Sequence, residues 1–273
     1  MKIRRLNKII LYNEGVDDNV DPHQIASYLK DRLGGIEVEV RSSLFSRELS
    51  QEQVAAYSKR LASAKICNAN RVWEEQEPLY GEVEYEKRAI SGKTKSVGIL
   101  YEGIELQLIY SELVPKTESN LRCVNIILTN RLFATWDNAN KRYHARASIL
   151  GMPSLISTTG IIEAPAKPRD YYILKQQYEM VGKDLLELGE RFSGQYIEYA
   201  DDRMTEVLKG YAMQSIFYSL TGTPFCQDSK CRLFNAHWQE EMISAQLHGE
   251  YEFCHEHAHL LSDLSAQSYA AIP

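Results

Sequence analysis

Long apolar runs are missing from this sequence. Near the N-terminus the apolar run ends after the four residues from Ile9 to Tyr12, which is too short for the core of a signal peptide. No other stretch approaches the roughly 18–20 apolar residues of a membrane helix. These absences predict a soluble, cytoplasmic protein that does not associate with a membrane.

An excess of basic residues is also missing. The chain has 31 Lys and Arg against 37 Asp and Glu, which gives a formal net charge of −6. Nucleic-acid-binding domains usually carry a basic surface. The charge balance therefore argues against a nucleic-acid partner, although Lys209, Lys230 and Arg232 could form a small basic patch.

Internal repeats, low-complexity tracts and Pro/Gly-rich linkers are absent as well, and only eight prolines occur in 273 residues. The hydrophobic share of 44% and the charged share of 25% are ordinary for a globular protein. We therefore expect a single domain over residues 1–273. Its first part, residues 1–165, should be a mixed α/β sheet, and its second part, residues 166–273, should be helical.

The first part has the pattern of an α/β or α+β fold with a mixed sheet. A buried strand is expected at 8–13, and a helix should begin at Asp21-Pro22, since Asp is a good N-cap and Pro fits the first turn. The alternating segment 36–40 predicts a strand that lies parallel to the first. Further expectations are a helix from Ser50 with Gln53 completing a capping box, a solvated loop at 67–80, a β-hairpin at 96–110, and β-structure at 124–128, 141–150 and 157–164.

The second part has helical periodicity. We expect helices at 168–181, at about 202–220 and at about 235–247, with a further helical stretch after Ala258.

Cysteines are few and unevenly distributed. The total is five, an odd number, while Cys67 and Cys123 stand alone. The other three form the pattern Cys226-x4-Cys231 and Cys254-x2-His257. Two pairs of ligands on separate short segments are typical of a closed structural zinc site.

This pattern predicts one structural zinc per chain, bound by Cys226, Cys231, Cys254 and His257. His255 and His259 are alternative fourth ligands. The competing interpretations are that the cysteines are small buried apolar residues, or that the first two form a disulfide. A disulfide would leave Cys254 without a role, and it is uncommon in a reducing cytosol.

Around these residues the chain resembles the archaemetzincin family of zinc metallopeptidases. The family motif is H-E-x-x-H-x-x-G-x-x-H-C-x4-C-x-M-x17-C-x-x-C. Its glycine falls on Gly222 and its first two cysteines on Cys226 and Cys231. The second pair falls on Cys254 and His257, with His in place of the last Cys. The resemblance covers residues 203–257 and implies a metzincin-like fold, in which helices flank a twisted mixed sheet and a zinc-stabilised helical part follows.

The residues of the family's peptidase centre are replaced. Its three zinc-binding histidines fall on Ser215, Ser219 and Phe225, its catalytic glutamate on Ile216, and its methionine on Leu233. None of these side chains can replace a neutral imidazole on the metal or a carboxylate base. The resemblance therefore implies a pseudoenzyme, in which Ser215 and Ser219 fill the former substrate cleft or the cleft binds a peptide or protein partner.

An active metallopeptidase with a relocated metal site is the alternative. The segment His237-Trp-Gln-Glu240-Glu241 places His237 and Glu241 one turn apart on a helix and is similar to an inverted zinc motif. The competing interpretation is an amphipathic helix with solvated acidic residues. The sequence itself identifies no substrate.

Overall fold

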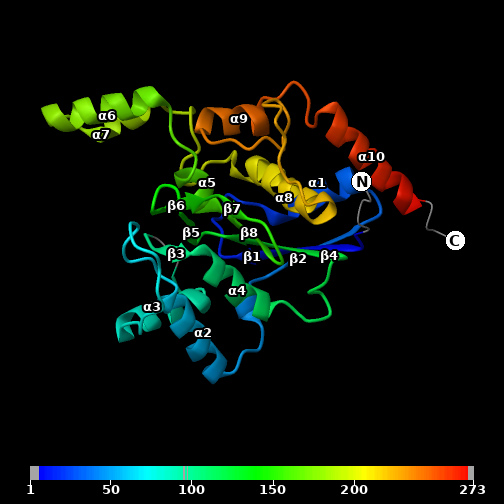
Figure 1. Cartoon of the computed structure of the whole chain (residues 1–273), viewed down its shortest axis with the longest axis horizontal. Helices are drawn as coiled ribbons and strands as arrows, with labels where there is room; N and C mark the ends of the chain where they lie inside the picture. The colour runs from blue at the N-terminus through cyan, green and yellow to red at the C-terminus, as the bar shows by residue number, and fades with distance from the viewer. Residues whose placement is uncertain (1–5, 95, 97, 270–273) are drawn as a thin grey trace.

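The computed structural model describes residues 6–94, 96 and 98–269. Its strands are β1 (Lys8–Glu14), β2 (Glu37–Arg41), β3 (Leu100–Glu102), β4 (Cys123–Thr129), β5 (Leu132–Asp137), β6 (Arg142–Arg146), β7 (Ser148–Ile149) and β8 (Ser154–Ser157). Its helices are α1 (Pro22–Leu33), η1 (Leu44–Ser46), α2 (Gln51–Ser63), α3 (Tyr80–Ile90), α4 (Gly103–Leu113), α5 (Thr158–Glu163), α6 (Arg169–Val181), α7 (Leu185–Arg191), α8 (Met204–Thr221), α9 (Gln239–Leu247) and α10 (His255–Tyr269). The fold is mixed α/β, as the sequence predicts (Figure 1).

The larger sheet has the strand order β2-β1-β4-β8-β7. Strand β1 pairs in parallel with β2 and with β4, and β4 pairs in parallel with β8. Strand β7 runs antiparallel to β8 and completes a mixed sheet. The predicted parallel strand–helix–strand unit at the start of the chain is confirmed. The side chain of Asp21 caps α1 by accepting the backbone N–H groups of His23 and Gln24.

Both faces of this sheet are buried. Along β1, Ile9 and Leu11 belong to one apolar core, and Ile10 and Tyr12 belong to a second core on the opposite face, because successive side chains of a strand point to opposite faces. Helices α1, α8 and α10 contribute to the first core, while η1, α2 and α4 contribute to the second. The first core extends from Leu6 to Leu264, so both ends of the described chain pack into it.

A smaller sheet has the strand order β3-β5-β6. The β-hairpin expected at 96–110 is wrong, because strand β3 in this segment is followed by helix α4. Val97 lies outside the described residues. Strand β3 ends at Glu102, whose carboxylate accepts the backbone N–H of Glu105 and so begins α4. The apolar residues here alternate, yet they also have helical spacing, and α4 buries Leu106, Ile109, Tyr110 and Leu113 against the second core. Burial of this helical stripe decides between the two patterns.

Two other segments differ from the sequence prediction. The expected β-structure at 157–164 is a strand only up to Ser157, whose hydroxyl accepts the N–H of Gly160 and caps α5. The helix expected from about 235 begins at Gln239. Elsewhere, the Ser50–Gln53 capping box is present in both directions and confirms the start of α2.

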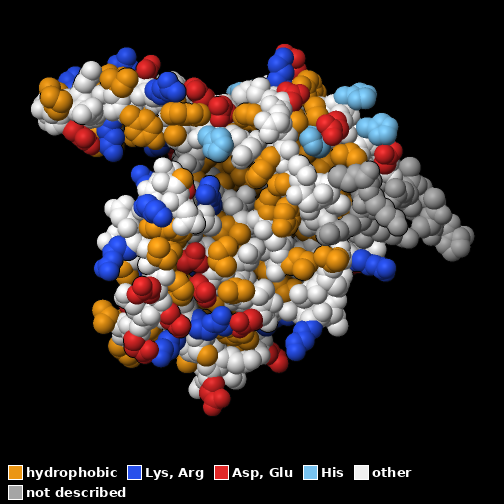
Figure 2. All heavy atoms as spheres, viewed as in Figure 1, with side chains coloured by type: hydrophobic (Ala, Val, Ile, Leu, Met, Phe, Trp, Pro, Cys, Tyr) orange, Lys and Arg blue, Asp and Glu red, His pale blue; other side chains and the backbone are white. Residues whose placement is uncertain are grey.

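Helices α6 and α7 form an arm that projects from the body of the protein (Figure 1). The arm packs through a small cluster of its own, around Leu188, Phe192 and Tyr196. Several apolar side chains remain on its surface (Figure 2), among them Ile173 and Met180. Across the described part of the chain, no helix combines the length and apolar character needed to cross a membrane.

Candidate metal centre

The loop after α8 brings two of the cysteines together. Gly222, with φ of 79°, ends α8 in the left-handed conformation that glycine adopts without strain. The loop then folds back on itself, since the N–H of Cys226 donates to the carbonyl of Leu233 at 2.9 Å. Within it, the N–H of Cys231 donates to the carbonyl of Asp228. The x4 spacing between the two cysteines is therefore a closed turn that directs both thiols to one side.

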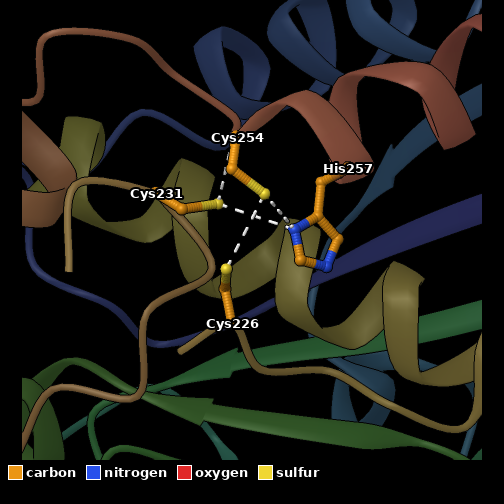
Figure 3. A group of neighbouring side chains, drawn as sticks. All are labelled: Cys226, Cys231, Cys254 and His257. Carbon is orange, nitrogen blue, oxygen red and sulfur yellow. Dashed lines mark hydrogen bonds between the residues drawn. The ribbon is translucent and has the colours of Figure 1, made fainter. Parts of the chain in front are cut away.

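The second pair of candidate ligands lies at the start of α10. Cys254 immediately precedes the helix, and its carbonyl accepts the N–H of Ala258. His257 follows three residues later, which places it on the same side of the first turn. The His257 ring packs edge-on against Phe217 of α8, with ring centroids 5.2 Å apart. This contact fixes the ring so that Nδ1 faces the thiols (Figure 3).

The four side chains converge to the size of a zinc site. Their candidate ligand atoms all lie within 4.8 Å of one another. The Sγ atoms of Cys226 and Cys254 are 3.8 Å apart, and Nδ1 of His257 lies 3.8 Å from Sγ of Cys231 and 3.0 Å from Sγ of Cys254 (Figure 3). A tetrahedron with Zn–S bonds of about 2.3 Å has sulfur–sulfur edges of roughly 3.8 Å. The donor set and its spacing fit a zinc ion.

The electrostatics of the cluster favour a metal over free thiolates. Burial raises the pKa of the Cys231 thiol to about 12 and also raises the pKa of Cys226. Burial lowers the pKa of His257, which favours the neutral imidazole, the form that binds metals. Backbone N–H groups of Asp228 and Cys254 point at the sulfurs of Cys226 and Cys231 at 3.3 Å and 3.5 Å. These donors are suited to stabilise thiolates once a cation is bound.

Neither alternative histidine joins the cluster. His255 is exposed at the first position of α10, and His259 is exposed with its Nδ1 3.3 Å from a carboxylate oxygen of Asp263. All five cysteines are free thiols in this structure.

Arg232, next to Cys231, fastens the loop to its surroundings. Its side chain is 6% exposed, and its guanidinium pairs with Glu252 at 2.8 Å and with Glu206 of α8. Its backbone N–H donates to the carbonyl of Glu252, and its carbonyl accepts the side-chain amide of Gln246. The loop is thus tied to the segment that leads into Cys254 and to α8 and α9 without help from the metal. Sequence reasoning missed this network, because its members lie far apart along the chain.

A cleft of about 450 Å³ lies beside α8, and none of the four residues of the cluster lines it. One wall is the chain from Ala145 to Ser148, which passes from β6 into β7, and the opposite wall is α8. The face of α8 that lines the cleft carries Tyr211, Gln214 and Tyr218, and further walls come from residues 224–225 and 234–237.

Ser215 and Ser219 do not line this cleft. Ser215 is fully buried and donates its hydroxyl to the carbonyl of Tyr211, and Ser219 donates to the carbonyl of Ser215. The residues one position earlier, Gln214 and Tyr218, face the cleft instead.

The other positions of the replaced motif are apolar contacts. Ile216 and Leu233 are fully buried in the first core, and Phe225 lines the cleft.

The segment around His237 is a helix start. Glu241 accepts the backbone N–H groups of His237 and Trp238 at 2.9 Å and 3.1 Å, and thereby caps α9. His237 is exposed and lines the cleft, while Glu240 is exposed. Within the described residues, the three-cysteine, one-histidine cluster is the only set of three or more His, Cys, Asp or Glu side chains close enough to hold a metal.

The chain thus combines a mixed α/β fold with a Cys₃His cluster at its helical end. The family model described as "Probable metallopeptidase family (DUF6775)" matches residues 5–264. The chain belongs to this family.

Two solved structures are similar in outline. A zinc-dependent peptidase from Methanocorpusculum labreanum is 10% identical and superposes with a TM-score of 0.45, covering 93% of this chain and 99% of that one. An archaemetzincin from Methanopyrus kandleri is 11% identical with a TM-score of 0.45, covering 95% of each chain. No curated protein matches this sequence.

Proposed function

We propose that this chain is an archaemetzincin-like protein without peptidase activity, in which one structural zinc stabilises the helical part and the cleft beside α8 binds an extended peptide. Cys226, Cys231, Cys254 and His257 are the proposed zinc ligands. The observation that carries the proposal is the convergence of these four side chains within 4.8 Å, separate from the cleft.

A zinc held by these residues would be structural. A catalytic zinc has three protein ligands and an open position for water, whereas four protein ligands close the tetrahedron. Three thiolates and one neutral imidazole give the zinc site a formal charge of about −1, which makes the metal a poor Lewis acid. Bound there, zinc would supply folding free energy rather than an activated water.

The cleft lacks the groups that a zinc peptidase uses. The face of α8 presents Gln214 and Tyr218 to it, in place of the neutral imidazoles and carboxylate base that such chemistry requires. His237 is a single imidazole. Of the two carboxylates that follow it, Glu240 does not line the cleft and Glu241 is engaged in capping α9.

The strands along one wall of the cleft suit a peptide in extended form. In the order of the described strands, β6 is the outer strand of the smaller sheet and β7 the outer strand of the larger one. Residues 145–148 join them along the cleft wall. Outer strands offer backbone N–H and C=O groups to an added strand.

Gln214 marks a point where the peptide would bond. Its side chain is 3% exposed, and its Oε1 has no hydrogen-bond partner in the described structure. Its amide nitrogen makes only a long bond, 3.4 Å, to the carbonyl of Phe234. A buried acceptor without a donor is costly, so a backbone N–H from a ligand would satisfy it.

A library of peptides screened for both binding and cleavage tests this function. We expect the wild type to bind some peptides and leave them intact. Gln214→Leu should weaken that binding by about five- to a hundredfold, because a buried polar contact contributes about 1–3 kcal/mol. The variant should fold, since leucine has nearly the same volume and removes an unpaired group. Gln176→Leu, on the exposed surface of α6, is the control and should bind like the wild type.

Cleavage of the peptides would contradict the proposal. If a chelator stopped that cleavage, the alternative of a relocated metal site around His237, Glu240 and Glu241 would be favoured. Equal binding by Gln214→Leu and wild type would show that the peptide does not occupy this cleft.

A further inference from the structure

A second cavity lies at the carboxyl ends of the parallel strands. It has a volume of about 210 Å³ and is separate from the cleft beside α8. Glu14 ends β1, Ser43 and Phe45 follow β2, and Asn130 and Arg131 follow β4, and all of them line it. In open α/β sheets, ligands bind outside the carboxyl ends of strands where the strand order changes direction. Here β1 leads to β2 on one side and β4 leads to β8 on the other, so the cavity lies at such a point.

Glu14 is the most unusual group in this cavity. Its side chain is buried, with the residue 8% exposed. One carboxylate oxygen accepts the hydroxyl of Ser43 at 2.7 Å, and the other accepts the backbone N–H of Leu44. Among the described residues, no lysine or arginine forms an ion pair with it. A buried carboxylate without a cation is rare in a folded protein, because its charge is costly to bury.

Arg131, the one basic side chain among the described residues that line the cavity, is committed elsewhere. Arg131 pairs with Glu86 at 2.8 Å, where the side chains are 6% and 0% exposed, and it also donates to the hydroxyl of Tyr101. Glu86 therefore holds the Arg131 guanidinium, and Glu14 interacts with that charge only at longer range. Among the described side chains that line the cavity, an ionised Glu14 is therefore the one charge without an ion-pair partner.

Two further features of the wall favour a cation. The C-terminal end of α3 reaches the cavity through Ala89, Ile90 and Gly92, and the C-terminus of a helix carries a partial negative charge. Phe45 contributes an aromatic side chain, and the face of an aromatic ring attracts cations. A calcium ion would need six to eight oxygen ligands, whereas a single carboxylate residue lines the cavity.

We propose that this cavity binds a small organic ammonium ion, with the ammonium group on Glu14 and its apolar part against Phe45. The hydroxyl groups of Ser43 and Ser96, which also line the cavity, suit a ligand with an additional hydroxyl. The volume limits the ligand, since sites for drug-sized molecules measure about 300–1,000 Å³.

Binding should depend on pH. Burial raises the pKa of the Glu14 carboxyl to about 7, against the lowering effect of Ser43, Leu44 and Arg131. Among the described residues, Arg131, after β4, and Tyr110, on α4, are the charged and titratable groups that interact with it. A protonated carboxyl cannot pair with an ammonium ion. Affinity should therefore rise about tenfold between pH 6 and pH 8, as the ionised fraction of a group with this pKa rises.

Calorimetric titration with ethanolamine tests the proposal, with ethylene glycol as an uncharged ligand of similar size. The wild type should bind ethanolamine and not ethylene glycol. Glu14→Gln should weaken ethanolamine binding by about ten- to a hundredfold, because hydrogen bonds to charged groups are the stronger ones. Glu102→Gln removes a carboxylate of equal exposure outside the cavity and should bind like the wild type.

Three results would overturn this inference: no binding of ethanolamine by the wild type, equal binding by Glu14→Gln, or tighter binding of glycine or calcium than of ethanolamine. The pH dependence in the wild type provides a test that needs no variant to fold. Peptide binding in the cleft beside α8 is measured separately, so either proposal can fail without the other.

Discussion

Replacing Cys231 with serine should destabilise this protein more than an ordinary core substitution does. Cys231 is fully buried, and its sulfur faces both the imidazole of His257 and the N–H of Cys254. A serine oxygen is a poor zinc ligand, so the variant should lose the metal along with the link between the loop after α8 and the start of α10. Structural zinc contributes about 10–16 kcal/mol of apparent binding free energy in small peptides.

The loss in this larger chain should be smaller than that but should exceed about 3 kcal/mol, the upper end for most substitutions. Arg232 and the first core continue to hold part of the segment. Urea denaturation followed by circular dichroism measures the change in the free energy of unfolding. Cys123→Ser replaces a buried cysteine outside the cluster and serves as the control. A strong chelator should destabilise the wild type and Cys123→Ser but leave Cys231→Ser unchanged. Equal stability of the two serine variants would contradict a structural zinc.

Replacing Glu86 with glutamine should cost about 3–5 kcal/mol of unfolding free energy, the usual result when one partner of a buried ion pair is removed. Glu86 is fully buried and accepts hydrogen bonds from Arg131 at 2.8 Å and from the hydroxyl of Tyr101 at 2.6 Å. The glutamine side chain keeps the shape but leaves the Arg131 charge uncompensated. Glu112→Gln, in the exposed pair with Arg60, should cost no more than about 1 kcal/mol.

A double-mutant cycle separates this cost from the net contribution of the pair. Arg131→Met combined with Glu86→Leu removes both charges, and buried pairs replaced by apolar residues are often no less stable. We therefore expect the double variant to be more stable than Glu86→Gln. The cycle compares the stability losses of Glu86→Leu and Arg131→Met with the loss of the double variant. If the two single losses summed to the loss of the double variant, the two side chains would not interact.

Local signals in the sequence predicted much of the fold. Asp21-Pro22 and the Ser50–Gln53 capping box mark helix starts through contacts within a few residues. The spacing of the cysteines and His257 is also a local signal, because each pair of candidate ligands lies on one turn. The prediction of a hairpin at 96–110 failed because tertiary packing decides the structure of this segment. Its apolar residues fit both a strand and a helix, and only the second core, assembled from distant segments, selects the helix.

The cleft and the second cavity could not be predicted from the sequence. Aligning the family glycine with Gly222 predicted that Ser215 and Ser219 lie at a cleft. In the structure, the residues one position earlier, Gln214 and Tyr218, line the cleft beside α8. The contact between Arg131 and Glu86 joins residues 45 positions apart, and no local pattern encodes it. Glu14 at the end of a buried strand was the one available signal, since carboxyl ends of parallel strands commonly carry binding groups.

Zinc per chain, determined by elemental analysis on the purified wild type and on Cys254→Ser, tests the central claim most directly. The account predicts one zinc per chain in the wild type and none in Cys254→Ser, because the remaining ligands cannot close a tetrahedron. Two zincs in the wild type, with one retained in Cys254→Ser, would contradict the absence of a second metal site and favour an active peptidase. A well-folded wild type without zinc would contradict the structural site itself.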